Sequence, residues 1–389
     1  MKRLLLLLTW LIAVPIGMLA QGSSWDTATM LNNGGTGSGT LDNDNQDAWF
    51  MVEVPEEGKV TITETIDGDL TLYAMYFCNA DASERKREGH YYGSGRTLEV
   101  TNVGKGTYYI HVQRSGGSGT FKINYQFTAC PYANDSEPND EAGQGDILEN
   151  GKTVQGRLGY LDANGYHDKD DWYRIEVPED GRVQLVFDCD QTYELSLYAL
   201  FFHWYKADDG TYPERARKGH YIRKDTLTIT DVGVGTYYIH VSRDGGHGGY
   251  TLKYIFTPNN YANDSEPNDE AGQGDEIAAG QTVQGHLGYR DATNYTDSND
   301  WYRIEVPRDG RVQLVFDCDQ TYNLSLYALF FHRYKADDGT YPERARKGHY
   351  IRKDTLTLTD VGAGTYYIRV NRDGGHGGYT LKYIFTPNN

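Results

Sequence analysis

Basic side chains are scarce in this 389-residue chain, which has 37 lysines and arginines against 55 aspartates and glutamates. The formal net charge of −18 argues against a nucleic-acid partner, because such binding depends on neutralising phosphates. Cysteine is also rare, and four residues are too few for a disulfide scaffold. After residue 20 no apolar run approaches the roughly 20 residues needed to cross a bilayer, so we expect no membrane span.

Signatures of catalysis are missing as well. The sequence has no His-Glu-x-x-His zinc motif, no Gly-x-Ser-x-Gly nucleophile elbow and no Gly-x-x-x-x-Gly-Lys phosphate loop. We therefore expect a protein without enzymatic activity. No stretch after residue 20 keeps a helical period, which disfavours an α-helical fold.

The first 20 residues have the pattern of a signal peptide. Lys2 and Arg3 form a basic start, an apolar stretch runs from Leu4 to Val14, and small residues surround a cleavage position after Ala20. This pattern predicts a protein that is secreted, periplasmic or attached to the cell surface. A membrane anchor is the alternative, although the apolar stretch is short for one.

The chain contains three copies of one sequence unit. Copy 2 (residues 132–257) and copy 3 (residues 261–389) align without a gap and are nearly identical, whereas copy 1 (residues 22–128) has diverged. The Asp-Ala-Trp-Phe sequence at residues 47–50 corresponds to Asp-Asp-Trp-Tyr at residues 170–173. Such repetition predicts three consecutive domains joined by short linkers near residues 128–132 and 257–261.

Within each copy the dominant sequence period is two. Tyr173, Ile175 and Val177 fall on one face of a predicted strand, with Arg174 and Glu176 on the other. Asp-Gly and Gly-Gly turn signals separate such runs. The sequence therefore predicts an all-β fold, in which three small antiparallel β-sandwiches follow the signal peptide.

Copies 2 and 3 open with the same acidic segment, Asn-Asp-Ser-Glu-Pro-Asn-Asp, at residues 134–140 and 263–269. In an extended chain Asp135, Glu137 and Asn139 point to one side. A second acidic cluster, at residues 168–171, comes just before the strand of Trp172. The two clusters offer oxygen ligands of the type that calcium binds, six to eight at a time. A solvated linker followed by an acidic turn is an equally simple interpretation.

These features together resemble the bacterial pre-peptidase C-terminal domain family, which is similar to the collagen-binding domains of clostridial collagenases. The resemblance rests on Glu-Pro-Asn-Asp near a domain start, an Asp before an aromatic pair, and a closing Gly-Thr-Tyr-Tyr-Ile-x-Val strand. It implies tandem jelly-roll-like β-sandwiches that are secreted, accompany a hydrolase and bind calcium. The calcium ligands implied by position are Asp135, Glu137, Asn139, Asp140, Asp168 and Asp171 in copy 2, and Asp264, Glu266, Asn268, Asp269, Asp297 and Asp300 in copy 3.

Two departures from the family pattern limit this resemblance. Copy 1 lacks the Glu-Pro-Asn-Asp segment and has Ala48 where Asp171 stands in copy 2, so we expect its metal site to be lost or weakened. The collagen-binding members resemble one another in tyrosines after the closing strand, where this chain has Ser242, Arg243 and Asp244. Collagen is therefore not the expected target.

Aromatic and basic residues also gather in one predicted loop of copy 2. Tyrosine, tryptophan and arginine dominate binding hot spots, and flat aromatic faces suit sugars. The alternative is that these side chains cover sheet surfaces, which tyrosine favours. The candidate ligand-binding residues are Trp204, Tyr205, Tyr212, Arg215, Arg217 and Tyr221.

The four cysteines fall into two pairs. Cys189 and Cys318 share a face with apolar neighbours in their predicted strands, so we expect buried thiols. Cys78 and Cys130 could form a disulfide after export, or could remain reduced.

The sequence as a whole predicts an exported, non-catalytic binding or adhesion protein. Calcium-stabilised β-sandwich modules would contact an extracellular polymer, either a polysaccharide or a fibrous protein, and repetition of the module would raise avidity. The alternative function is an accessory or regulatory partner of a secreted peptidase or other hydrolase.

Overall fold

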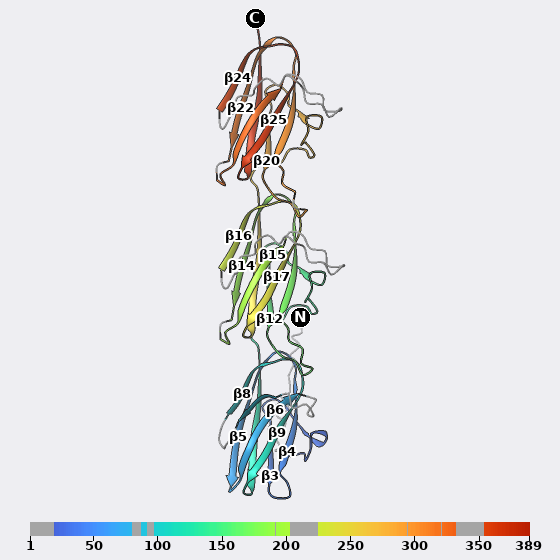
Figure 1. Ribbon diagram of the computed structural model, residues 1–389, viewed down its shortest axis with the longest axis vertical. Coiled ribbons are helices and arrows are strands. Elements are labelled where there is room, and N and C mark those ends of the chain that lie inside the picture. The colour runs from blue at the N-terminus through green and yellow to red at the C-terminus, as the bar shows by residue number, and fades with distance from the viewer. Residues whose placement is uncertain are drawn as a thin grey trace, which may run out of the picture.

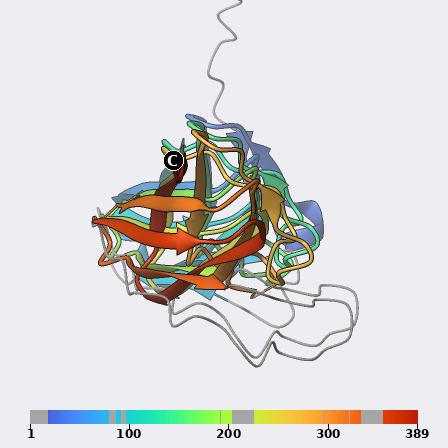
Figure 2. The same ribbon diagram turned by 90° about the horizontal axis from the view of Figure 1, so that it is seen from above.

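In the computed structural model the described residues are 19–79, 87–91, 97–190, 192–202, 225–293, 295–319, 321–331 and 354–389. They form three β-sandwiches stacked end to end in a column, one for each copy (Figure 1). Seen down the column, the three copies overlie one another with their strands in similar directions (Figure 2). The predicted all-β fold of tandem sandwiches is confirmed.

Copy 1 has two five-stranded sheets, in the orders β1-β3-β10-β5-β8 and β2-β4-β9-β6-β7. A short 3-10 turn, η1 (Trp25–Thr27), is the only helical element among the described residues. The strands of copy 1 are β1 (Leu19–Ala20), β2 (Thr29–Leu31), β3 (Thr36–Leu41), β4 (Asp47–Val54), β5 (Gly58–Gly68), β6 (Thr71–Asn79), β7 (Arg87–Tyr91), β8 (Thr97–Val103), β9 (Gly106–Gly116) and β10 (Gly119–Ala129).

Copies 2 and 3 each have two four-stranded sheets. Their orders are β11-β13-β17-β15 and β12-β18-β14-β16 in copy 2, and β19-β21-β25-β23 and β20-β26-β22-β24 in copy 3. The strands of copy 2 are β11 (Asp146–Ile147), β12 (Thr153–Leu158), β13 (Asp170–Val177), β14 (Gly181–Cys189), β15 (Ser196–Phe202), β16 (Asp225–Val232), β17 (Gly235–Gly245) and β18 (Gly248–Pro258). Those of copy 3 are β19 (Asp275–Glu276), β20 (Thr282–Leu287), β21 (Asn299–Val306), β22 (Gly310–Cys318), β23 (Ser325–Phe331), β24 (Asp354–Val361), β25 (Gly364–Gly374) and β26 (Gly377–Pro387).

Most strand pairs are antiparallel, as predicted, but short parallel pairs occur at one edge. β11 runs parallel to β13, and β19 runs parallel to β21. In copy 1, β1 runs parallel to β3. β1 contains Leu19 and Ala20, the last residues of the predicted signal peptide, and residues 1–18 lie outside the described part of the chain.

The cores follow the predicted alternation and are rich in tyrosine. Ile175 and Val177 of β13 are buried, and so is Tyr173 between the two sheets. Tyr250 of β18 is also fully buried. A tyrosine hydroxyl buried in this way needs a hydrogen-bond partner, which directs attention to the polar groups that these rings reach.

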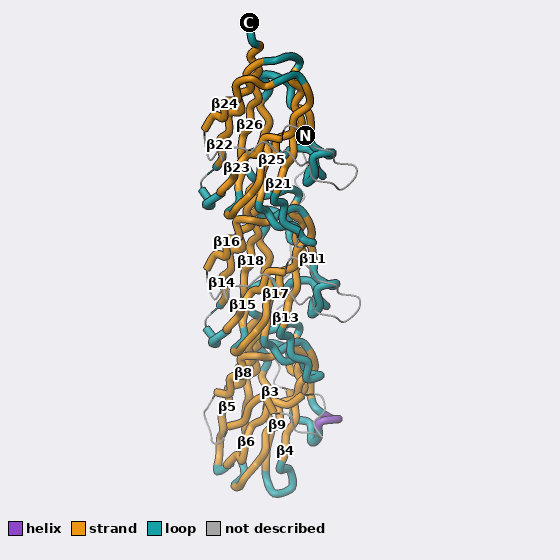
Figure 3. The backbone as a smooth tube through the Cα atoms, turned by 45° about the horizontal axis from the view of Figure 1, so that its top comes forward, coloured by secondary structure: helices purple, strands orange, loops and turns teal. Residues whose placement is uncertain are grey.

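The three sandwiches follow one another along the column (Figure 3). The same backbone hydrogen bonds join them at both junctions. A loop of copy 2 lies against the end of copy 1, where the Gly104 amide donates to the Leu161 carbonyl at 2.7 Å and the Leu161 amide donates to the Asn102 carbonyl at 2.9 Å. A side chain on Gly106 would collide with Ala163, since a Cβ there would lie 2.3 Å from the Ala163 Cβ. This close approach requires glycine.

The junction between copies 2 and 3 repeats this arrangement. The Gly233 amide donates to the Arg290 carbonyl at 2.6 Å, and the Arg290 amide donates to the Asp231 carbonyl at 2.9 Å. A Cβ on Gly235 would lie 2.3 Å from the Ala292 Cβ. Repeated contacts of this kind set a constant spacing between modules.

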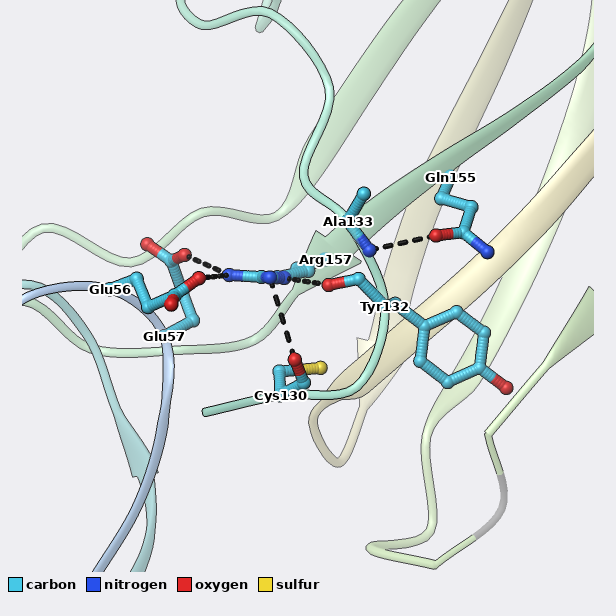
Figure 4. A network of polar contacts seen from close by, with 7 residues as sticks. All are labelled: Glu56, Glu57, Cys130, Tyr132, Ala133, Gln155 and Arg157. Atoms are coloured by element: carbon cyan, nitrogen blue, oxygen red, sulfur yellow. Dashed lines mark hydrogen bonds and ion pairs between the residues drawn. The ribbon is translucent and has the colours of Figure 1, made fainter. Parts of the chain in front are cut away.

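A side-chain network adds to the first junction (Figure 4). The Arg157 guanidinium, 7% exposed, donates to Glu56 Oε2 at 2.9 Å and to Glu57 Oε2 at 3.0 Å. It also donates to the carbonyl oxygens of Cys130 and Tyr132 in the linker. At the second junction His286 stands in place of arginine, with Nδ1 3.0 Å from Asp180 Oδ2.

All four cysteines lie among the described residues and are buried, and none forms a disulfide. Cys189 and Cys318 are buried thiols in the sandwich cores, as predicted. The bond that the sequence left open between Cys78 and Cys130 is not formed.

Candidate metal centre

Five of the six ligands predicted in copy 2 come together at the start of the sandwich. Carboxylate oxygens of Asp135, Glu137 and Asp171 lie within 4.8 Å of one another. The Asp168 side chain is hydrogen-bonded to the Glu137 side chain, and Asn139 Nδ2 donates to Asp135 Oδ2 at 2.7 Å. The segment before β11 and the first residues of β13 therefore supply one oxygen cluster.

Two core tyrosines orient the carboxylates. The Tyr173 hydroxyl donates to Asp135 Oδ2, and the Tyr250 hydroxyl donates to Asp171 Oδ2 at 2.5 Å. The two hydroxyl oxygens lie 2.6 Å apart, so the two carboxylates are held by neighbouring tyrosines. Each carboxylate thus has one oxygen held from the core side, which fixes the direction of the other.

Four oxygens of the cluster have no hydrogen-bond partner. These are the Oδ1 atoms of Asp135, Asn139, Asp168 and Asp171, and each is buried. Asn139 is 2% exposed and Asp171 is fully buried. Buried polar atoms are otherwise almost always hydrogen-bonded, and a buried carboxylate without compensation is costly. Four such oxygens at one place fit the ligand shell of a hard cation.

The electrostatics of the cluster agree with this geometry. Burial, reinforced by the neighbouring Glu137 carboxylate, raises the pKa of Asp168 to about 9. Burial also raises the pKa values of Asp135, Glu137 and Asp171, with repulsion from adjacent carboxylates adding to each. A divalent cation relieves both the desolvation and the repulsion. Calcium accepts an all-oxygen shell with flexible geometry, so the residues fit it.

Copy 3 reproduces the centre. Carboxylate oxygens of Asp264, Glu266 and Asp300 lie within 4.8 Å of one another. Tyr302 donates to Asp264 Oδ2 at 2.5 Å, and Tyr379 donates to Asp300 Oδ2. The Oδ1 atoms of Asp264, Asn268 and Asp300 are again buried without a hydrogen-bond partner. Asp297 has a pKa raised to about 9 by burial and by the Glu266 carboxylate.

Asp140 and Asp269, the remaining predicted ligands, each contact a tyrosine hydroxyl. The Tyr166 hydroxyl is 2.6 and 2.8 Å from the two carboxylate oxygens of Asp140, which is exposed. Tyr295 is placed in the same way, 2.7 Å from both oxygens of Asp269. Of the predicted ligands, these two are therefore engaged with a tyrosine at the edge of the centre.

Copy 1 lacks both the Asp171 carboxylate and the two tyrosine hydroxyls of this centre. Ala48 pairs with Val112 at the register position that Asp171 holds against Val241 in copy 2. The orienting tyrosines are replaced by Phe50 and Phe121, whose rings pack edge to face at 6.2 Å in the core. The carboxylate and both hydroxyls have been replaced together by apolar groups.

The orienting role of Tyr173 and Tyr250 was not foreseen from the sequence. The alternation of Tyr173 with polar residues predicted only that it lies on one face of a strand. A signal was present, since copy 1 has phenylalanine at both positions and alanine in place of Asp171. The proposed aromatic and arginine cluster of copy 2, residues 204–221, lies outside the described residues.

No family model matches the sequence, and no curated protein matches it. Among solved structures, the chain is similar to the pre-peptidase C-terminal domain of a collagenase from Bacillus anthracis, with 17% identity, a TM-score of 0.21, and coverage of 31% of this chain and 99% of that one. It is also similar to the M60 catalytic domain with the CBM51-1 and CBM51-2 domains of ZmpB from Clostridium perfringens, with 10% identity, a TM-score of 0.17, and coverage of 89% and 34%. Within the described residues, no helix is long and apolar enough to cross a membrane.

Proposed function

We propose that the protein is an exported, non-catalytic binding protein whose second and third modules are stabilised by calcium, and that it contacts an extracellular polymer. The observation that carries this proposal is the set of buried, unpartnered Oδ1 atoms in copies 2 and 3. The resemblance of these copies to the pre-peptidase C-terminal domain family agrees with such a role.

The cation would join two segments that are distant in sequence. Asp135, Glu137 and Asn139 belong to the segment that leaves the linker, whereas Asp171 belongs to β13. The Trp172 amide already donates to the Asn139 carbonyl at 3.0 Å, so the segment starts from a position against the strand. When bound, calcium supplies the positive charge that holds these carboxylates together.

The stacked arrangement suits a repeating target. Equivalent backbone contacts at the two junctions hold the modules at a constant spacing, so equivalent surfaces recur along the column. Weak contacts made by several modules multiply into a higher avidity when the target also repeats. Polysaccharides and fibrous proteins have such repeats.

The test is cosedimentation of residues 21–389 with insoluble polysaccharides and with collagen fibres, each in calcium and in chelator. We expect retention on one of these polymers in calcium and weaker retention in chelator. If the chain is retained on none of them, and a pull-down from culture medium yields a single hydrolase, the polymer-binding role is wrong and the accessory role replaces it.

A proteolysis experiment tests the role of calcium separately. We expect chelator to expose the segment around Asp135 to a protease, because the ion that fastens this segment is removed. Equal cleavage in calcium and in chelator would contradict the proposed stabilisation of the linker.

A further inference from the structure

A cleft lies at the junction between copies 1 and 2, next to the candidate metal centre. Its volume is about 510 Å³, within the range of about 300–1,000 Å³ that small-molecule sites occupy. Gly104 and Lys105 of copy 1 line one side, and Glu137 and Asp168 of copy 2 line the other. The cleft therefore exists only where two modules meet.

The metal centre borders this cleft, because Glu137 and Asp168 belong to both. Five side chains of copy 2 converge on the centre, whereas calcium takes six to eight oxygen ligands. Oxygens of a ligand in the cleft can complete such a shell. The buried Oδ1 atoms of Asn139 and Asp171 lack hydrogen-bond partners and mark the centre as a place for an ion.

Copy 1 contributes a positive charge to the same cleft. Lys105 is exposed and lines it. Arg157 also lines the cleft, but its guanidinium is bound by Glu56 and Glu57 (Figure 4). Among the described residues that line the cleft, Lys105 is therefore the cation available to an anionic group of a ligand. The lining carboxylates outside the metal centre are engaged, Glu57 by Arg157, Asp140 by the Tyr166 hydroxyl and Asp162 by two backbone amides.

A fixed aromatic ring lies in the lining. Tyr166 is 51% exposed, and its hydroxyl is held by the Asp140 carboxylate at 2.6 and 2.8 Å. Its amide donates to Asp162 Oδ1 at 2.8 Å, so the backbone is also held. An aromatic ring fixed at both ends provides contact area at a low cost in conformational entropy.

We propose that this cleft binds an acidic sugar residue of a glycan. Sugar hydroxyls or the carboxylate complete the calcium shell, Lys105 pairs with the carboxylate, and the sugar ring lies against Tyr166. The proposal rests on the calcium role in the proposed function and names the class of polymer that this site takes.

The second junction provides a natural comparison within the same chain. It keeps the carboxylates of the metal centre and a tyrosine held by aspartate, Tyr295 on Asp269. Val234 stands in place of Lys105, and His286 in place of Arg157. We therefore expect one acidic-sugar site per chain, although the chain has two metal centres.

The test measures binding of methyl β-D-glucuronide to residues 21–389 by ligand-observed NMR, with methyl β-D-glucoside as the neutral match. We expect the glucuronide to bind in calcium, at one site per chain, and the glucoside to bind about tenfold more weakly because it lacks the charge. Lys105→Val, which copies the second junction, should weaken glucuronide binding about tenfold. Lys122→Val changes an exposed lysine elsewhere in copy 1 and should have no effect.

Calorimetric calcium binding is measured on the same samples, so that two failures can be told apart. If calcium binds but the glucuronide does not bind, binds as weakly as the glucoside, or is unaffected by Lys105→Val, the inference about the cleft is wrong and the calcium modules stand. If calcium itself does not bind, both the proposed function and the inference fail.

Discussion

Replacing Asp171 with asparagine should change the stability of copy 2 in opposite directions with and without calcium. Asp171 is fully buried, and burial together with nearby Asp135 and Asp168 raises its pKa well above the ordinary value. Asparagine has almost the same shape and keeps an oxygen, so the Tyr250 hydroxyl retains an acceptor. The substitution removes the charge with little change in packing.

The size of each change follows from the burial of this group. In chelator, removing a buried charge without a compensating partner should stabilise copy 2 by about 1–3 kcal/mol. In calcium the variant loses a charged ligand. A ligand present at about one hundred times its dissociation constant contributes about 2.7 kcal/mol, so most of that stabilisation should be lost. The two effects have opposite signs.

The assay is differential scanning calorimetry of the full chain in both conditions, with Asp300→Asn as the matched variant in copy 3. For Asp171→Asn we expect a higher melting temperature of one transition in chelator and a lower one in calcium, each by several degrees. Each variant should move a different transition, because the two centres lie in separate cores. A variant that is less stable in both conditions would refute the interpretation of the cluster as a cation site.

Three further predictions concern other parts of the chain. Glu64 is buried in copy 1, and burial raises its pKa to about 7. Its contribution to stability is therefore present below about pH 4.5 and is lost as the pH rises through 7. In denaturant unfolding, Glu64→Gln should match the wild-type chain at pH 4 and be more stable by up to about 3 kcal/mol at pH 8. Gly235→Ala should displace Ala292 and loosen the junction between copies 2 and 3, which small-angle scattering would detect as more bending of the column. Gly364 has a similar positive φ but open space around it, so Gly364→Ala should leave the scattering unchanged. Arg157→Met should destabilise the first junction by about 1–3 kcal/mol and increase protease cleavage of the linker. Equal pH profiles for wild type and Glu64→Gln, equal scattering of the two glycine variants, or an unchanged cleavage rate would each contradict the corresponding prediction.

Much of the fold could be predicted because its signals are local. Strand alternation such as that of Tyr173, Ile175 and Val177 depends on the two-residue period of a strand, and the structure follows it. The three copies of the sequence unit likewise predicted three sandwiches. The parallel edge strand β11 was missed, because two residues are too few for a period to be visible.

The candidate metal centre could be predicted only in part. Asp135, Glu137 and Asn139 are close in sequence, so their grouping could be anticipated from the extended backbone. Which oxygen of each side chain stays unpartnered depends on Tyr173 and Tyr250, and Tyr250 lies far along the chain in β18. Contacts between distant strands of this kind are set by the packing of the two sheets, which no local pattern encodes.

The same limit applies to the junctions. The linkers were recognised, but the contact of Gly106 with Ala163 and the network around Arg157 join residues that are distant in sequence. The cleft that contains Lys105 depends on the same docking. A junction of two modules has no sequence motif of its own, and only the folded chain reveals it.

The most direct test of the calcium centres is a calorimetric titration of residues 21–389 with calcium. We expect two sites per chain, one after Asp171→Asn or Asp300→Asn, and none in the double variant, because copy 1 has Ala48 at the equivalent position. No binding heat in the wild-type chain, or two sites retained in the double variant, would contradict the assignment of calcium to these residues.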